Sequence, residues 1–126
     1  MIVIDTSVWI EFLRNNPLFF PEVRLLLENR QVIGLEWIFG ELMQGARNTR
    51  EGDVINSYWT NLPKVDTAGV WIEAGRLFSE GNLFSKGIGL INCAIVIAAR
   101  RAGAKVWTLD KKLNTFLGKK ERYGLD

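Results

Sequence analysis

The sequence predicts an α/β domain in which helices cover both faces of a central, mostly parallel sheet. Three short apolar runs rich in β-branched residues, at positions 2–4, 32–35 and 106–109, are typical of strands buried on both faces. The stretches between these runs carry apolar residues at helical spacing. Alternating strands and helices favour parallel pairing, because a parallel connection needs a long crossover that is usually a helix.

The first half of the chain is expected to hold two strands and four helices. The strand at residues 2–4 ends at Asp5, and Thr6 or Ser7 then begins a helix, because hydroxyl residues are favoured helix caps. Pro17 belongs to a turn, and Pro63 ends the fourth helix. The remaining elements expected here are helices at residues 21–29, 36–46 and 53–62, a buried strand at residues 31–35 and a charged loop at residues 48–52.

The second half adds one strand and three helices. The expected elements are a short extended piece at residues 64–66, helices at residues 68–84, 90–102 and 111–117, and a strand at residues 105–109. Gly81 weakens the end of the first of these helices, because glycine is a poor helix former. Gly103 stands where the apolar second helix needs a C-cap. Asp110 ends the last strand as Asp5 ends the first, and a basic tail follows at residues 118–122.

Size and composition fit one globular domain over residues 1–126. The chain has 126 residues, of which 48% are hydrophobic, enough for a sizeable core. Apolar runs fall short of the ~20 residues of a membrane span, and the first residues do not resemble a secretion signal. Cys93 is the only cysteine, which favours a reducing compartment. We therefore expect a cytoplasmic protein with no membrane partner.

The absence of histidine narrows the chemistry. It excludes Ser–His and Cys–His nucleophile pairs, histidine general bases and histidine metal ligands. An enzyme of this composition has to work through carboxylates, lysine or a metal bound by oxygen, and oxygen ligands favour Mg²⁺ or Mn²⁺. The net charge of +2 permits a nucleic-acid partner without requiring one.

Two aspartates stand at the ends of predicted strands. If Asp5 and Asp110 end strands of one parallel sheet, their carboxylates come to the same edge, where α/β folds place their ligands. Like charges that meet repel unless a cation lies between them. Each residue could instead simply cap the helix that follows it, since aspartate is a favoured N-cap.

Two more polar residues interrupt apolar helical patterns. Glu41 has Ile38 and Gly45 as helical neighbours, although a solvated surface glutamate is the ordinary alternative. Apart from Cys93, Asn92 is the only hydrogen-bonding side chain between residues 90 and 99, although it could cap that helix. Together with the two aspartates, these residues would supply three carboxylates and one amide, a reasonable Mg²⁺ or Mn²⁺ site.

The motifs together resemble the PIN-domain toxins of the VapC type. The matching segments cover nearly the whole chain in order: IVIDTSVWIEFLR at 2–14, GELMQG at 40–45, GLIN at 89–92, AAR at 98–100 and VWTLD at 106–110. The resemblance implies a three-layer α/β/α PIN-like fold and a Mg²⁺- or Mn²⁺-dependent endoribonuclease. It also implies an RNA substrate such as tRNA or rRNA, a homodimer, and a VapB-type antitoxin whose C-terminal segment blocks the site.

Carried over by position, Asp5, Glu41 and Asp110 match the catalytic, metal-binding acids of the family, and Thr6 and Thr108 match polar positions beside them. The family pattern has an aspartate where this chain has Asn92. Asparagine keeps the shape and one carbonyl oxygen but loses the charge, so it would hold a cation less tightly and could not deprotonate water. We therefore expect impaired catalysis, and the alternative is an inactive PIN-like module that binds nucleic acid or antitoxin.

Substrate binding would need cations around this acidic site, although most lysines and arginines are simply solvated. The candidates are Arg14, Arg47, Arg50, Lys86, Lys111, Lys112 and the tail at residues 119–122. A phosphate-accepting signalling domain is disfavoured because Thr6 and Ser7 stand where its second acid would be. A dinucleotide-binding domain is disfavoured because the third glycine of its motif would fall at Asn92.

Overall fold

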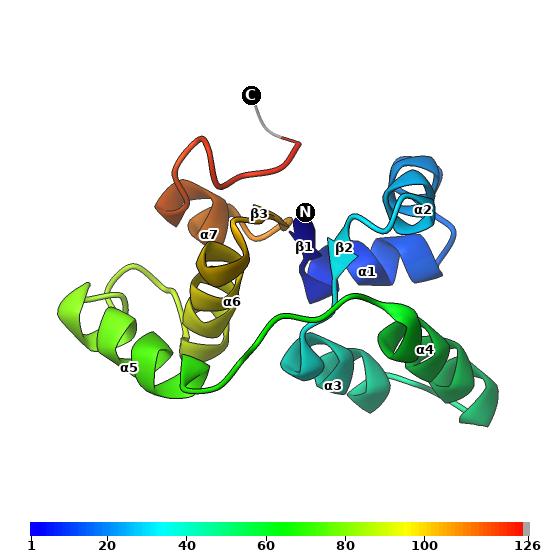
Figure 1. The fold of residues 1–126 in the computed structure, drawn as a ribbon, viewed down its shortest axis with the longest axis horizontal. Helices are drawn as coiled ribbons and strands as arrows, with labels where there is room; N and C mark the ends of the chain where they lie inside the picture. Colours follow the sequence, from blue (N-terminus) through cyan, green and yellow to red (C-terminus); the bar gives the residue numbers. More distant parts are fainter. Residues whose placement is uncertain (125–126) are drawn as a thin grey trace.

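A three-stranded parallel sheet lies at the centre of the computed structural model, which describes residues 1–124 (Figure 1). The strand order is β2 (Val32–Ile33), β1 (Ile2–Ile4), β3 (Lys105–Trp107). The central strand pairs with both neighbours, so that Ile2 lies opposite Val32 on one side and Lys105 on the other. The prediction of an α/β fold with a parallel sheet is therefore confirmed.

At each outer edge of the sheet, a further segment of the chain forms a single backbone bridge. Gly34, just after β2, forms a parallel bridge with Lys64, and Gly34 N donates to Pro63 O at 2.8 Å. On the other side Val106 forms a parallel bridge with Arg122, and Val106 N donates to Glu121 O at 2.7 Å. The expected extended piece at residues 64–66 thus forms a bridge at its first residue, and part of the basic tail lies against β3.

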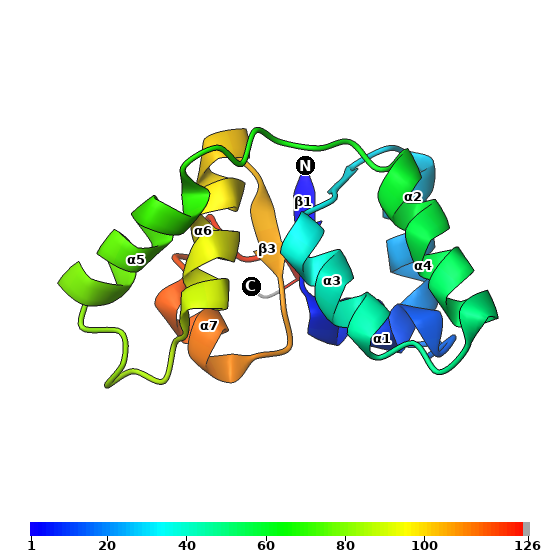
Figure 2. The same cartoon turned by 90° about the horizontal axis from the view of Figure 1, so that it is seen from below.

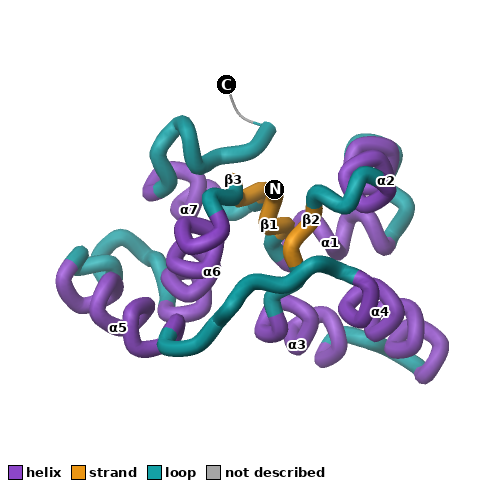
Figure 3. The backbone as a smooth tube through the Cα atoms, in the orientation of Figure 1, coloured by secondary structure: helices purple, strands orange, loops and turns teal. Residues whose placement is uncertain are grey.

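Seven helices surround the sheet in the described part of the chain. They are α1 (Thr6–Leu13), α2 (Phe20–Glu28), α3 (Glu36–Gln44), α4 (Thr49–Asn61), α5 (Val70–Glu80), α6 (Leu90–Ala102) and α7 (Lys111–Phe116). Helices α1 to α4 lie on one side of the strands and α5 to α7 on the other, in both cartoon views (Figures 1 and 2). The tube shows the strands between these two groups, and the long α4–α5 connection crossing from one group to the other (Figure 3).

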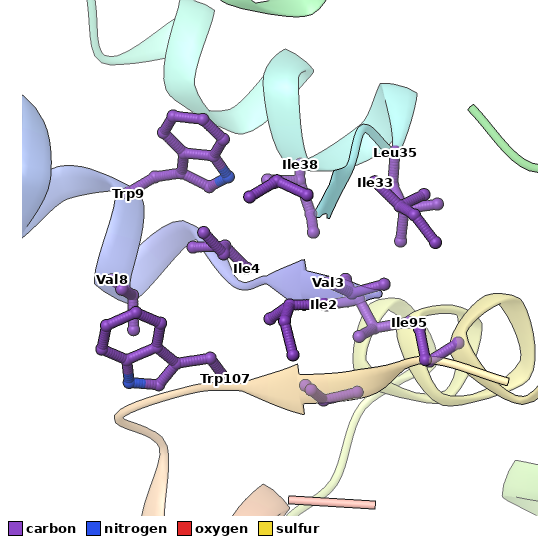
Figure 4. Close-up of a cluster of buried hydrophobic side chains, with 14 of the residues drawn as sticks. Ile2, Val3, Ile4, Val8, Trp9, Ile33, Leu35, Ile38, Ile95 and Trp107 are labelled. Carbon is purple, nitrogen blue, oxygen red and sulfur yellow. The ribbon is translucent and has the colours of Figure 1, made fainter. Parts of the chain in front are cut away.

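The core forms where the strands meet these helices. All three residues of β1 are buried, which is why β-branched side chains suit both of its faces. In Figure 4, Ile4, Trp9 and Ile38 lie together at one side of this cluster, and Ile95 of α6 lies at the other side. A second, smaller cluster lies between α5 and α6 and contains Val70, Ala74, Leu83, Ile88, Cys93 and Ala94. The two clusters hold the helices at fixed places around the sheet.

Several boundaries differ from the sequence-based expectation. The prediction of a charged loop at residues 48–52 is wrong, because α4 already begins at Thr49. Asn48 caps it by accepting a hydrogen bond from Glu51 N at 2.9 Å. Helix α5 begins at Val70 instead of residue 68, since Gly69 has a φ of +74° and helical residues have negative φ, and it ends at Glu80 instead of residue 84, with Gly81 as its C-cap. The bounds of α6 are confirmed, and Gly103 ends it with a φ of 63°.

Within residues 1–124 we find no helix with the length and apolar character needed to cross a membrane.

Candidate active site

One open pocket gathers the side chains that the sequence singles out. It holds about 730 Å³ and lies beyond the carboxyl ends of β1 and β3, between α3 and the start of α6. Its lining residues are Asp5, Thr6, Ser7, Glu41, Gly89, Leu90, Ile91, Asn92, Leu109 and Asp110. The four residues expected to form the site therefore line the same pocket, although they come from four separate segments of the chain.

Asp5 lines this pocket and is buried, with only 8% of its surface exposed. Its Oδ1 accepts a hydrogen bond from Thr6 N at 2.8 Å, so it caps α1 as the simpler interpretation expects. Its Oδ2 accepts from Thr108 Oγ1 at 2.6 Å and from Ser7 Oγ at 3.2 Å. Three donors satisfy the buried charge and hold the carboxylate in one orientation.

Thr108 and Ser7 join the segment after β1 to the segment after β3. Besides donating to Asp5, Thr108 Oγ1 accepts from Asp110 N at 3.0 Å, and Ser7 Oγ accepts from Leu109 N at 3.1 Å. These side-chain bonds replace backbone pairing, which explains why β3 ends at Trp107 rather than at Leu109. Thr108 lies beside the site as expected. A place for Ser7 in the site was not predicted from the sequence. The feature that could have indicated it is a hydroxyl side chain two residues after Asp5.

Asp110 caps the last helix and also lines the pocket. Its Oδ1 accepts from Lys112 N at 2.9 Å and from Leu113 N at 3.2 Å, which makes it the N-cap of α7. Its other oxygen takes part in no hydrogen bond within residues 1–124. Asp110 therefore caps its helix and lines the pocket at the same time, as Asp5 does.

Glu41 comes to the pocket from the second turn of α3. Its Oε1 accepts from Thr6 Oγ1 at 2.9 Å, a contact between residues 35 positions apart. Glu41 is exposed, so solvent reaches the carboxylate from one side while Thr6 holds it on the other. A purely solvated surface glutamate would have no such partner at the edge of a pocket.

Asn92 lies in the first turn of α6, half-buried and facing the pocket. It does not cap its helix, because the N-cap is Gly89 and no side chain bonds there. Asn92 makes none of the side-chain hydrogen bonds found within residues 1–124. The capping alternative is therefore wrong for Asn92, and its amide oxygen remains available to a ligand in the pocket.

The donor atoms of the pocket fit a hydrated Mg²⁺ or Mn²⁺ ion in kind. Among residues 1–124, no three Asp, Glu, Cys or His side chains come close enough together to hold an ion by themselves. Mg²⁺ does not need such a cage, because it is usually bound by one or two carboxylates, several waters and substrate phosphates. The pocket offers carboxylate oxygens and one amide oxygen, which are the ligands that these cations prefer.

The expected substrate-binding cations divide into groups. Arg14, Arg47 and Arg50 line a second pocket, which adjoins the first through Glu41. Arg47 is paired with Glu51 at 2.9 Å. Lys112 lies against Gly87 on the α5–α6 connection, where an added Cβ would meet its Nζ at 2.7 Å. Lys86, Lys111 and the described tail residues line neither of these pockets.

Comparison with known proteins identifies the family. Residues 2–116 match the family model described as the PIN domain. The chain is 32% identical over 114 residues to a protein named Ribonuclease VapC32 from two strains of Mycobacterium tuberculosis. This match covers 90% of this chain and 87% of that protein.

A solved structure supports the fold. It is described as the crystal structure of VapBC2 from Rickettsia felis bound to a DNA fragment from their promoter, and it matches with a TM-score of 0.71 at 19% identity. The match covers 97% of this chain and 96% of that chain, so the two folds agree over nearly their full length. This chain therefore belongs to the PIN-domain family, within the VapC-type ribonuclease toxins.

Proposed function

We propose that this chain is a metal-dependent endoribonuclease that hydrolyses RNA phosphodiester bonds in the pocket around Asp5. The observation that supports this most is the meeting of Asp5, Glu41 and Asp110 with Asn92 in one open pocket. Carboxylates gathered from distant segments are costly to bring together unless a cation or a reaction uses them.

Asp5 and Asp110, with the amide oxygen of Asn92, would hold Mg²⁺ or Mn²⁺, and Glu41 would hold a second ion or orient water. When bound, such an ion polarises a phosphate oxygen and helps to activate the attacking water. Asp5 presents its carboxylate in a fixed direction because Thr108 and Ser7 both donate to it. Glu41 keeps one oxygen outside its bond to Thr6, and this oxygen can accept a hydrogen bond from the attacking water.

Asn92 weakens this site in our proposal. An amide keeps the oxygen of the expected aspartate but lacks its negative charge, so it attracts a divalent cation less strongly. We therefore propose that the chain cleaves RNA slowly. Asn92 also favours the second candidate, a binding module without catalysis that holds nucleic acid or antitoxin.

The resemblance and the family assignment support the remaining parts of the proposal. We propose a cytoplasmic toxin that acts on tRNA or rRNA, forms a homodimer, and is neutralised by a VapB-type antitoxin. The similar structure from Rickettsia felis is described as VapBC2, which is consistent with such a partner for this chain.

The test compares the unchanged chain with Asn92→Asp in an RNA cleavage assay containing Mg²⁺, Mn²⁺ or EDTA. We expect Asn92→Asp to cleave at least about tenfold faster, since changes around metal ligands typically alter activity by 10–100-fold. EDTA and the double variant Asp5→Asn, Asn92→Asp should both abolish cleavage. Equal, robust cleavage by both chains would show that Asn92 is no defect. No cleavage by Asn92→Asp would favour the binding module instead.

A further inference from the structure

Three aliphatic side chains line the same pocket as the carboxylates and stay open to solvent. Leu90 and Ile91 are 45% and 43% exposed, and Leu109 is 45% exposed. We call these three residues the aliphatic wall. Apolar surface in contact with water is unfavourable, and none of the three can bind a metal or take part in proton transfer. The proposed hydrolysis therefore does not account for their presence in the pocket.

The backbone holds the aliphatic wall in place. Leu90 and Ile91 are the first two residues of α6, which is anchored by the buried Cys93 and Ala94 directly behind them. Leu109 is fixed from the opposite segment, because its N–H donates to Ser7 Oγ at 3.1 Å. Side chains on rigid supports can recognise a ligand with little loss of conformational entropy.

We propose that the aliphatic wall contacts the bases of unpaired nucleotides on either side of the RNA bond being cleaved. This inference depends on the proposed function, because it takes that bond to lie at the carboxylates. The neighbouring bases then lie within one nucleotide of the pocket. Aliphatic side chains cannot form hydrogen bonds with phosphates or base edges, but they can pack against a base face. In a duplex those faces are covered by stacking, so only unpaired nucleotides offer them.

The first experiment removes the base instead of the protein side chain. A single-stranded eight-nucleotide RNA with a mapped cleavage position is compared with the same RNA carrying an abasic ribonucleotide next to that position, using Asn92→Asp. We expect kcat/KM to fall about 5- to 20-fold for the abasic RNA, which is the lower part of the range for a base stacked on an aromatic side chain, because an aliphatic contact is weaker. When Leu90→Ala or Leu109→Ala is added to Asn92→Asp, the ratio of kcat/KM for intact RNA to kcat/KM for abasic RNA should approach one.

A matched control uses an aliphatic residue of similar exposure elsewhere. Leu25 on α2 is 57% exposed and lines neither pocket, so Leu25→Ala should keep the full abasic effect. A second experiment measures RNA affinity instead of cleavage. The same RNA, labelled with fluorescein, is titrated with the unchanged chain in the absence of divalent metal, and fluorescence anisotropy reports the binding. Binding should also weaken for the abasic RNA, and this weakening should disappear in Leu109→Ala.

The outcomes separate the two proposals. If wall variants slow cleavage of intact and abasic RNA equally, or change only the oligomeric state or the affinity for antitoxin, the wall is not a base contact and the inference is wrong. If no chain cleaves RNA but binding still depends on the base and on Leu109, the hydrolysis proposal fails while the base contact stands. If neither cleavage nor binding depends on the base, the inference is overturned.

Discussion

The Asp5 carboxylate caps α1 and also faces the pocket, so one side chain serves two purposes. The same is true of Asp110 and α7. From the sequence these interpretations looked like alternatives, but an aspartate has two oxygens and can satisfy both. The capping bond uses Oδ1 in each case. A cap at the end of a strand is therefore no argument against a site.

Thr108 makes the shortest of the three hydrogen bonds that orient the Asp5 carboxylate. Thr108→Val removes the hydroxyl that donates to Asp5 at 2.6 Å and accepts from Asp110 N. We expect the free energy of unfolding to fall by about 1–3 kcal/mol, because a buried carboxylate loses a donor. We also expect slower RNA cleavage in the Asn92→Asp chain. Urea unfolding and the cleavage assay measure the two effects.

Thr115→Val is the matched control for this prediction. Thr115 is exposed on α7, and within residues 1–124 its hydroxyl bonds only to Lys111 O one turn earlier. This change should alter the free energy of unfolding by less than about 0.5 kcal/mol and leave cleavage unchanged. Equal effects of the two substitutions would contradict the role given to Thr108.

Residue types and spacing were enough to select Asp5, Glu41, Asn92 and Asp110, which share one pocket. Their roles in catalysis and metal binding stay predictions. Other members of the pocket could not be selected in this way. Leu90, Ile91 and Leu109 look like ordinary core residues in a sequence, and only their exposure in the folded chain distinguishes them.

At the scale of elements, the start of α4 shows how a cap can override composition. Residues 48–52 are polar and charged, which suggested a loop, but Asn48 supplies a cap to Glu51 N and Arg47 pairs with Glu51. The strand ends were missed for a related reason. Apolar residues continue after β3, but Thr108 and Ser7 side chains bond where backbone pairing stops. Such long-range contacts are invisible to local patterns.

We predict that Asn48→Ala destabilises the chain by about 1 kcal/mol, the usual cost of losing an asparagine cap. The Asn56→Ala change serves as its control, because Asn56 is exposed in the middle of α4. Alanine is the better helix former there, so this control should be neutral or stabilising by a few tenths of a kcal/mol. Chemical unfolding of the three chains gives the comparison, and an unchanged stability in Asn48→Ala would rule out the capping role.

At the scale of the whole molecule, Tyr123 ties the end of the described chain to α2. Its hydroxyl donates to Glu22 Oε1 at 2.6 Å, across 101 positions. Its ring lies 5.0 Å from that of Trp107 on β3, measured between centroids. Burial, followed by the bond to the Glu22 carboxylate, raises the pKa of Tyr123 to about 12.

This pKa predicts a pH dependence. A tyrosine in the unfolded chain titrates near 10, so between about pH 10 and 12 the folded chain keeps a proton that the unfolded chain loses. The free energy of unfolding therefore falls as pH rises through this window. Tyr123→Phe should be less stable by about 1 kcal/mol below pH 9, the value of one hydrogen bond, and the difference should shrink above pH 10. Urea unfolding of both chains at pH 8 and pH 10.5 tests this, and a constant difference would contradict it.

The overall architecture was predictable because its signals are local. Three β-branched runs and the helical patterns between them define an α/β chain, and the bounds of α6 follow from its apolar run and Gly103. The strand order β2-β1-β3 was not predictable, because it depends on which faces of the helices pack together. The same packing decides which polar residues meet.

The position of β1 has a consequence for how the protein is made. The first strand of this sequence is the middle strand of the sheet, and its partner β3 lies about one hundred residues further along the chain. Asp5 likewise gains its Thr108 donor from 103 positions away. Before residues 108–110 are synthesised, the nascent polypeptide lacks both Asp110 and the hydrogen bond from Thr108 that orients Asp5. The pocket that holds Asp5 and Asp110 can therefore form only after residues 108–110 have been synthesised.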